Sequence, residues 1–221
     1  RQNSLMTAQI SSLAEPGRDC PLCPRLVDFR HGNREKFPDW HNGPVISFGP
    51  KDAAFLIVGL APGLRGANRT ARPFTGDYAG DLLYQTLDRF GFSEGTYVSE
   101  GKDDLKLVDC RITNAVRCVP PENKPIGAEV KACAPFLQME LAGPRRVVLA
   151  LGGLAHGAVL SGLGIPKSRF KFGHNAVHEP GAGFTLVNSY HCSRYNTNTG
   201  KLTESMFEDV FRTIRSLLDT D

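Results

Sequence analysis

The chain alternates short apolar segments with longer amphipathic ones. Four segments have the character of strands, at residues 53–60, 105–116, 146–152 and 184–188. The first (AAFLIVGL) and the third (RVVLALG) are almost unbroken apolar runs. Runs of this kind are typical of strands that are buried on both faces of a sheet.

Segments with apolar residues at helical spacing separate or follow these strands. They span residues 81–90, 128–141 and 202–218, and a further helix opens near Leu154. In the last helix the apolar residues recur on one face, which should pack in the core, and Thr203 is the predicted N-cap. Alternating strands and helices predict an α/β fold with three layers, α/β/α, in which a mostly parallel sheet is the middle layer.

Three loops that follow predicted strands hold nearly all the unusual residues. They comprise residues 61–77, 114–124 and 190–200. In a parallel sheet, functional groups collect beyond the carboxyl ends of the strands, because the loops at that edge lie side by side. We therefore expect these three loops to form one site.

Composition sets limits on the class of protein. The 221 residues are 41% hydrophobic and 22% charged, with a formal net charge of +3. This length suits one domain over residues 1–221, which we expect to be monomeric. The weakly basic charge permits a nucleic-acid partner without requiring one. Because no apolar run could cross a bilayer and the first residues do not resemble a signal peptide, we expect no membrane partner and a cytoplasmic, nucleoid-associated protein.

Four cysteines form an unequal pattern. Two residues separate Cys20 from Cys23, whereas fourteen separate Cys118 from Cys133. A two-residue spacing lets one turn present two thiolates to an ion or a cluster, and the fold would have to bring in the distant pair. Buried, unligated thiols are the alternative interpretation. The spacing leaves both zinc and a four-iron cluster open.

A glycine-rich loop follows the first predicted strand. Residues 59–63 (GLAPG) lead through a stretch that contains Arg65, Arg69 and Arg72 to Asp77. Such a loop could cradle a phosphate group. It matches neither the Walker pattern nor the dinucleotide fingerprint, so we expect no nucleotide cofactor, and contact with a nucleic-acid backbone stays open.

A polar loop follows the last predicted strand. Nine polar or adaptable residues begin at His191, which alone among the six histidines has such a setting. A long solvated turn is the alternative, but the density of hydrogen-bonding groups after a strand favours a functional loop. Cys192 in this loop and Cys110 in a predicted strand are not assigned to the metal site.

Five motifs can be read together, in chain order. They are residues 59–63 (GLAPG), 68–70 (NRT), 74–77 (FTGD), 113–121 (TNAVRCVPP) and 191–200 (HCSRYNTNTG). This set resembles the motifs of the uracil-DNA glycosylases, in particular the iron–sulfur type b branch, family 5. The resemblance covers most of the chain, keeps the order of the family and includes all four cysteines.

The resemblance has consequences for fold, cofactor and activity. It implies a [4Fe-4S] cluster held by Cys20, Cys23, Cys118 and Cys133, which ties the N-terminal arm to the middle of the chain. It also implies a central four-stranded, largely parallel sheet. The implied activity is excision of uracil, and of other deaminated or altered bases such as hypoxanthine and ethenocytosine, from double-stranded DNA, leaving an abasic site.

The matched residues suit this chemistry, in which a flipped base departs with negative charge while positive charge builds on the sugar. Phe74 resembles the stacking aromatic of the family, and Asn114 can both donate and accept along a base edge. A neutral His191 can donate a hydrogen bond to a base oxygen as charge develops. Gly63 is assigned to the base pocket, and Asp77 to stabilising the sugar cation or orienting water. A helix cap is the alternative role for Asp77.

The polar loop is predicted to meet the DNA. Arg194 could contact a phosphate or fill the space that the base vacates, and Ser193 and Asn196 could bind phosphates as neutral donors. Two positions depart from the common type b pattern: Gly63 replaces an alanine, and Cys192 replaces a proline. Both changes could alter the shape of the pocket.

Two other classes of function compete with the enzyme. The first is a non-catalytic module that binds damaged DNA and is held together by zinc or an iron–sulfur cluster. It would carry the same motifs without cleaving a bond. An electron carrier would need an exposed, reversible cluster, for which the DNA-facing motifs offer no reason. Alkali treatment of a reacted uracil-containing duplex separates the first alternative from the enzyme.

Overall fold

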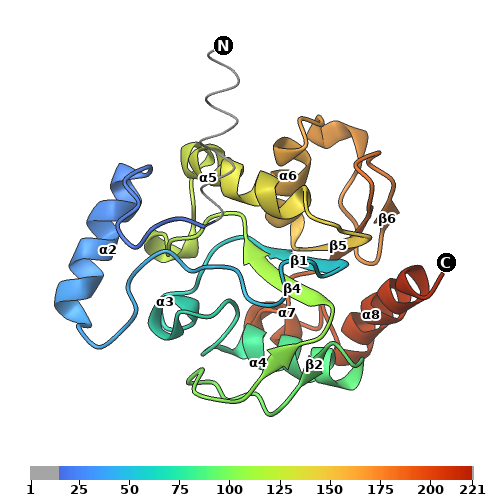
Figure 1. Cartoon of the computed structure of the whole chain (residues 1–221), viewed down its shortest axis with the longest axis horizontal. Helices are drawn as coiled ribbons and strands as arrows, with labels where there is room; N and C mark the ends of the chain where they lie inside the picture. The colour runs from blue at the N-terminus through green and yellow to red at the C-terminus, as the bar shows by residue number, and fades with distance from the viewer. Residues whose placement is uncertain (1–14, 221) are drawn as a thin grey trace.

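The computed structural model describes residues 15–220. The first residues, which were compared with a signal peptide above, lie outside the described part. Its centre is a five-stranded sheet in the order β4-β1-β5-β7-β6 (Figure 1). The strands are β1 (Phe55–Gly59), β4 (Cys110–Asn114), β5 (Val147–Leu151), β6 (Val177–His178) and β7 (Thr185–Ser189). Four strands are parallel, and β6 pairs antiparallel with β7.

The prediction of a mostly parallel sheet in an α/β fold is confirmed, but the sheet has five strands and not four. The additional strand, β6, has two residues, which is too short to create a periodic pattern. The segment predicted as one strand at residues 105–116 also divides in two. Its first part, β3 (Lys106–Leu107), pairs antiparallel with β2 (Ser93–Glu94). Asp109 then adopts φ 48° and turns the chain into β4.

Helices cover both faces of the sheet, as Figure 1 shows. Side chains alternate along β1: Phe55 and Ile57 pack on one side with α4 (Tyr78–Arg89) and α8 (Glu204–Leu218), while Leu56 and Val58 pack on the other. The second side is covered by α5 (Gly127–Leu141) and α6 (Gly153–Gly162). This alternation explains why the sequence of β1 is apolar throughout.

Shorter or peripheral elements complete the described chain. They are α2 (Pro24–Lys36), α3 (Ala67–Thr70), α7 (Arg194–Asn198) and the 3₁₀ turns η1 (Pro121–Asn123) and η2 (Lys167–Arg169). Within residues 15–220, no helix has both the length and the apolar character needed to cross a membrane.

Two helix caps position the loops of the site. The Thr203 hydroxyl accepts a hydrogen bond from Met206 N at 3.1 Å, which confirms the predicted cap of α8. The Asp77 carboxylate accepts from Gly80 N at 3.1 Å and begins α4 at Tyr78, three residues earlier than apolar spacing predicts. The earlier start places the carboxylate at the edge of the sheet, beside the end of β1.

A buried charge network anchors the first described residues to the sheet. Glu140 on α5 accepts from Arg111 Nε at 2.8 Å and from Arg145 Nη2 at 3.1 Å. Glu15 accepts a hydrogen bond from Arg111 Nη2 at 3.2 Å and forms an ion pair with Arg117. The three guanidinium groups are almost fully buried, and Glu140 is the one carboxylate of the described residues that pairs with Arg145, so removing Glu140 would leave a buried charge without a partner. The network holds Glu15, which lies five residues before Cys20, against Arg111 and Arg117.

Candidate active site

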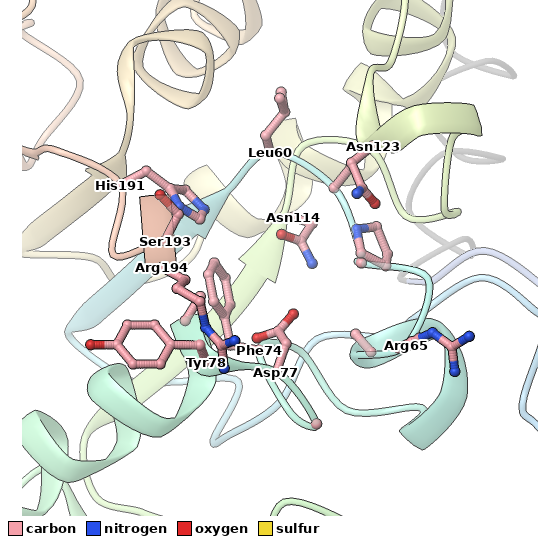
Figure 2. Close-up of a pocket in the computed structure, with 16 residues that line it drawn as sticks. Leu60, Arg65, Phe74, Asp77, Tyr78, Asn114, Asn123, His191, Ser193 and Arg194 are labelled. Atoms are coloured by element: carbon pink, nitrogen blue, oxygen red, sulfur yellow. The ribbon is translucent and has the colours of Figure 1, made fainter. Parts of the chain in front are cut away.

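A cavity of about 610 Å³ lies beyond the carboxyl ends of β1, β4 and β7. The three loops that the sequence predicts to form one site all contribute to it. Phe74, Asn114 and His191 line this cavity together, from three different loops. Figure 2 shows these side chains, with that of Asp77, directed toward a common space.

Phe74 has a strained backbone that turns its ring onto the end of the sheet. Its φ of 52° lies in the left-handed region, which costs on the order of 1–3 kcal/mol for a residue of this kind. Gly59 makes room for the ring, since a Cβ there would lie 2.5 Å from Phe74 Cζ. The ring centroid is 6.1 Å from that of His191, at an interplanar angle of 32°. The space beside Phe74 is therefore walled by two flat groups.

Asn114 ends β4 and is 2% exposed. Its backbone carbonyl accepts from Arg117 Nε at 3.1 Å. Its side-chain Oδ1 has no hydrogen-bond partner among the described residues. A buried polar atom without a partner costs about 1–3 kcal/mol. Because this amide also lines the cavity, a ligand in the cavity could supply the missing hydrogen bond.

His191 follows β7 and is held by its own loop. Asn196 Nδ2 donates to the His191 carbonyl at 2.9 Å, so this predicted DNA-binding amide supports the histidine backbone. Burial lowers the pKa of the His191 imidazole below its ordinary value, and the negative charge of Asp77 partly opposes that shift. The imidazole is therefore neutral at neutral pH and can donate from one ring nitrogen.

Asp77 uses its two carboxylate oxygens differently. One carboxylate oxygen, Oδ1, caps α4 through Gly80 N. The other, Oδ2, faces two glycines: a Cβ at Gly63 would lie 3.0 Å from it, and a Cβ at Gly66 would overlap it. The glycines thus leave Oδ2 accessible from the cavity, which both Gly63 and Asp77 line.

The polar loop places two more predicted residues at the cavity. Ser193 caps α7, with its hydroxyl accepting from Asn196 N at 3.2 Å. The exposed Arg194 lies with its guanidinium carbon 5.4 Å from the ring centroid of Tyr78. Ser193, Arg194 and Tyr78 all line the cavity.

The three arginines of the glycine-rich loop have separate environments. Arg72 points inward and forms a two-point ion pair with Asp103 at 2.7 and 2.8 Å, which lowers the pKa of that carboxyl to about 2. Arg69 Nε donates to the Arg65 carbonyl at 2.9 Å. Only Arg65 of the three lines the cavity, and its guanidinium carbon lies 5.8 Å from the ring centroid of Trp40. The sequence does not separate these roles, because the partners Asp103 and Trp40 are distant along the chain.

Comparison with known proteins connects this geometry to a family. The family model of the Uracil DNA glycosylase superfamily matches residues 46–215. The chain belongs to that superfamily. This span contains the loops that supply Phe74, Asn114 and His191.

Two similar relatives are named Type-5 uracil-DNA glycosylase. The protein from Thermus thermophilus is 44% identical over 206 residues, which are 90% of this chain and 93% of the relative. The protein from Mycobacterium leprae is 41% identical over 208 residues, covering 90% and 91%. A Type-4 uracil-DNA glycosylase from Pyrobaculum aerophilum is 37% identical over 158 residues, covering 70% and 66%.

This superfamily member brings its four unequally spaced cysteines to one place. Cys20, Cys23, Cys118 and Cys133 line a single small cavity, which Leu26 and Phe136 help to enclose. Burial raises the pKa of the Cys23 thiol to about 11 and that of Cys118 to about 12. Among residues 15–220, no three His, Cys, Asp or Glu side chains are arranged as the ligands of one metal ion.

The donor set of this second cavity consists of sulfur alone. Four sulfur atoms and no carboxylate or imidazole line it. Thiolates suit zinc and iron–sulfur clusters, and each iron of a four-iron cluster takes its own cysteine. Ligands of four separate irons lie farther apart than ligands of one zinc ion. The four cysteines of this cavity are therefore the residues that could hold a thiolate-bound cofactor.

The remaining two cysteines are part of the core. Cys110 in β4 and Cys192 after His191 are both fully buried. The Cys192 thiol lies 3.5 Å from the Ala79 carbonyl, to which it can donate, and burial raises its pKa to about 12. Cys192 therefore packs the end of β7 against α4 and is not available as a nucleophile.

Proposed function

We propose that this protein is a monofunctional DNA glycosylase that hydrolyses the N-glycosidic bond of uracil flipped out of double-stranded DNA, leaving an abasic site. The observation that carries this proposal is the shared cavity of Phe74, Asn114 and His191. Membership of the superfamily and two relatives at 41–44% identity support it. Each of these two relatives matches 90% of this chain.

Each wall of the cavity matches one need of the reaction. The flat Phe74 ring can stack on an extruded base, which has left the stacking of the duplex. The Asn114 amide, which has an unpartnered oxygen, can pair with the edge of the base. As the glycosidic bond breaks, the base gains negative charge, and the neutral His191 can donate a hydrogen bond to a base oxygen.

Asp77 faces the same space with a negative charge. The sugar becomes cationic as the bond breaks, and the free Oδ2 of Asp77 can stabilise that charge or accept a hydrogen bond from the attacking water. Gly63 and Gly66 have no side chains that would block Oδ2. We propose that Asp77 performs this role while its other oxygen caps α4.

The activity can be tested with a duplex that carries one uracil and an end label. Incubation followed by alkali should break the labelled strand at the uracil position, whereas the matched thymine duplex should stay intact. Binding of the uracil duplex without alkali-sensitive sites would contradict the enzyme proposal and favour a module that binds damaged DNA.

Substitution of Asp77 should separate its two roles. Asp77→Asn keeps an N-cap of equal quality and removes the charge, so the single-turnover excision rate should fall about 10- to 100-fold with little change in Tm. Asp77→Ala removes both the helix cap and the charge, so it should slow excision and also cost about 1 kcal/mol of stability. Rates equal to wild type in both variants would remove Asp77 from the mechanism.

We also propose that the cavity accepts other deaminated or altered bases, namely hypoxanthine and ethenocytosine. The cavity of about 610 Å³ has space for a two-ring base, and Gly63 adds no side chain beside Asp77. Single-turnover excision from three duplexes that differ only in the lesion would order these substrates. Excision restricted to uracil would limit the proposal to that base.

The DNA contact is proposed to involve both sides of the cavity. Figure 2 shows Arg194 and Arg65 on opposite sides of Asp77. Neither guanidinium lies within 4 Å of a carboxylate of the described residues, so both can bind phosphates. The nearby hydroxyl of Ser193 is a neutral donor for the same backbone. The DNA strand would then be held on each side of the extruded nucleotide.

Replacing Arg65 should weaken DNA binding without slowing the chemical step. For Arg65→Gln, the Kd for uracil duplex should rise about 5- to 10-fold, and the slope of log Kd against log salt should become shallower by about 1. Lys51→Gln is the matched control, because Lys51 is exposed and precedes β1, at the opposite end of the strand from the cavity. An unchanged salt slope for Arg65→Gln would exclude a phosphate contact.

We further propose a [4Fe-4S] cluster at Cys20, Cys23, Cys118 and Cys133. The common cavity and the all-sulfur donor set support this cofactor. When bound, the cluster would act as a structural link between the segment that begins α2 and the segment around α5. The excision chemistry would stay with the residues of the first cavity.

A further inference from the structure

Arg30 is a buried arginine at the cysteine cavity. It lies on α2, is 2% exposed and lines this cavity with the four cysteines. Its Nη2 donates to the Cys20 carbonyl at 3.1 Å, and its Nη1 lies 3.8 Å from Cys118 Sγ. One guanidinium group therefore bridges the two segments that carry the cysteines.

The charge of Arg30 has no carboxylate partner among the described residues. No carboxylate oxygen of residues 15–220 lies within 4 Å of it, and its Nε lacks a hydrogen-bond acceptor. Asp19, which lies near Arg30 in sequence, instead binds Arg34 Nη1 at 2.7 Å. An arginine stays protonated even when buried, and a buried charge without a counterion is strongly destabilising.

The second arginine at this cavity shows the contrast. Arg117 also lines the cavity, but it forms an ion pair with Glu15. Arg30 has no equivalent partner among the described residues, and the cavity contains no carboxylate. The Cys118 sulfur, at 3.8 Å, is thus the group in contact with Arg30 that can carry negative charge, which cysteine sulfurs do as thiolate ligands of a metal.

We propose that Arg30 is the counterion and the sulfur hydrogen-bond donor of the cluster, and so a positioning residue for it. This inference rests on the proposed cofactor. A cation beside the cluster favours its more negative, reduced state and so raises the reduction potential. The bond to Cys118 and the bond to the Cys20 carbonyl hold two ligand segments together, which slows loss of the cluster.

Three variants test the proposal in the full chain: Arg30→Gln, Arg30→Lys and the control Arg34→Gln. Arg34 is on the same helix and, unlike Arg30, binds a carboxylate as well as two carbonyls, and it does not line the cavity. The measurements are iron and sulfide per chain, the rate of loss of cluster absorbance in air, and the reduction potential of the cluster.

Arg30→Gln should shift the potential to more negative values and speed cluster loss about 10-fold. Arg30→Lys keeps the charge but not the two-point contact, so its potential should stay near wild type while its cluster is lost faster. Arg34→Gln should leave the potential unchanged, whatever its effect on Tm. A purely structural role for Arg30 would lower Tm without a shift in potential.

The outcomes distinguish this inference from the cofactor proposal. Wild-type protein without iron and sulfide would remove the cluster and the inference together. Wild-type protein with a cluster, and Arg30→Gln with unchanged potential and unchanged rate of loss, would overturn the inference alone. If Arg30→Gln does not fold, Arg30→Lys decides: cluster loss at the wild-type rate would overturn the hydrogen-bonding role.

Discussion

Replacing His191 by alanine is expected to lower the single-turnover rate of uracil excision about 10²- to 10³-fold while leaving Tm nearly unchanged. In the proposed mechanism the imidazole donates a hydrogen bond to a base oxygen as negative charge develops there. Losing one such donor typically costs about 3–4 kcal/mol in the transition state. The ring makes no hydrogen bond to another described residue, so its removal breaks no internal hydrogen bond.

The exposed His31 on α2 provides the control for this experiment. His31→Ala should leave both the rate and Tm at wild-type values. A rate for His191→Ala within a few-fold of wild type would exclude the imidazole as an electrostatic catalyst. A large fall in Tm together with the rate would point to misfolding of the loop.

The pH dependence of the same group follows from its environment. Burial lowers the pKa of His191 below 6.5, so the imidazole should stay neutral as the pH falls through 6.5. The excision rate should be flat across this region and change only at lower pH. The unfolded chain takes up this proton more readily, so acidification below pH 6.5 removes stability from the wild type. A step in the wild-type profile at or above pH 6.5, absent from His191→Ala, would contradict the lowered pKa.

Replacing Cys118 by alanine is expected to abolish the iron and sulfide content and to destabilise the fold strongly. Loss of a structural metal site belongs to the largest single-mutation effects, on the order of 4 kcal/mol or more, which equals about 10 °C in Tm for a chain of this size. The cysteine cavity shares no lining residue with the cavity of Phe74, Asn114 and His191. The ratio of uracil to hypoxanthine excision by the surviving folded protein should therefore not change.

Cys110→Ala is the control, since Cys110 is a fully buried cysteine that does not line the cysteine cavity. It should retain iron and sulfide and cost only the loss of a small core group. Zinc without iron in the wild-type protein would replace the cluster proposal by a zinc site. Unchanged iron content in Cys118→Ala would remove that residue from the ligand set.

Much of the architecture follows from local pattern. The apolar runs at β1 and β5 predict buried strands, because a strand covered on both faces has no polar positions. The amphipathic spacing and the threonine cap predict α8 for similar reasons. The glycine-rich and polar loops mark the edge of the sheet at which the site forms. These signals act within a few residues of one another, so the sequence alone reveals them.

The finer features depend on partners that are distant in the chain. Arg72 and Arg65 look alike in sequence, yet one pairs internally with Asp103 and the other lies over Trp40 at the cavity. Phe74 adopts its unusual φ because Gly59 and Gly80 leave room for its ring and its carbonyl. No local propensity predicts these contacts, because each depends on how the loops pack on the finished sheet.

The chain by itself determined the parallel strands of the sheet, the main helices that cover it and the residue types at the site, since periodicity, caps and motifs are local properties. Tertiary structure decided which of those residues share a cavity, that Asp77 caps a helix with one oxygen and faces the cavity with the other, and that Arg30 lies buried against the cysteines. These outcomes depend on burial and on charge pairing between distant segments, and both exist only once the chain has folded.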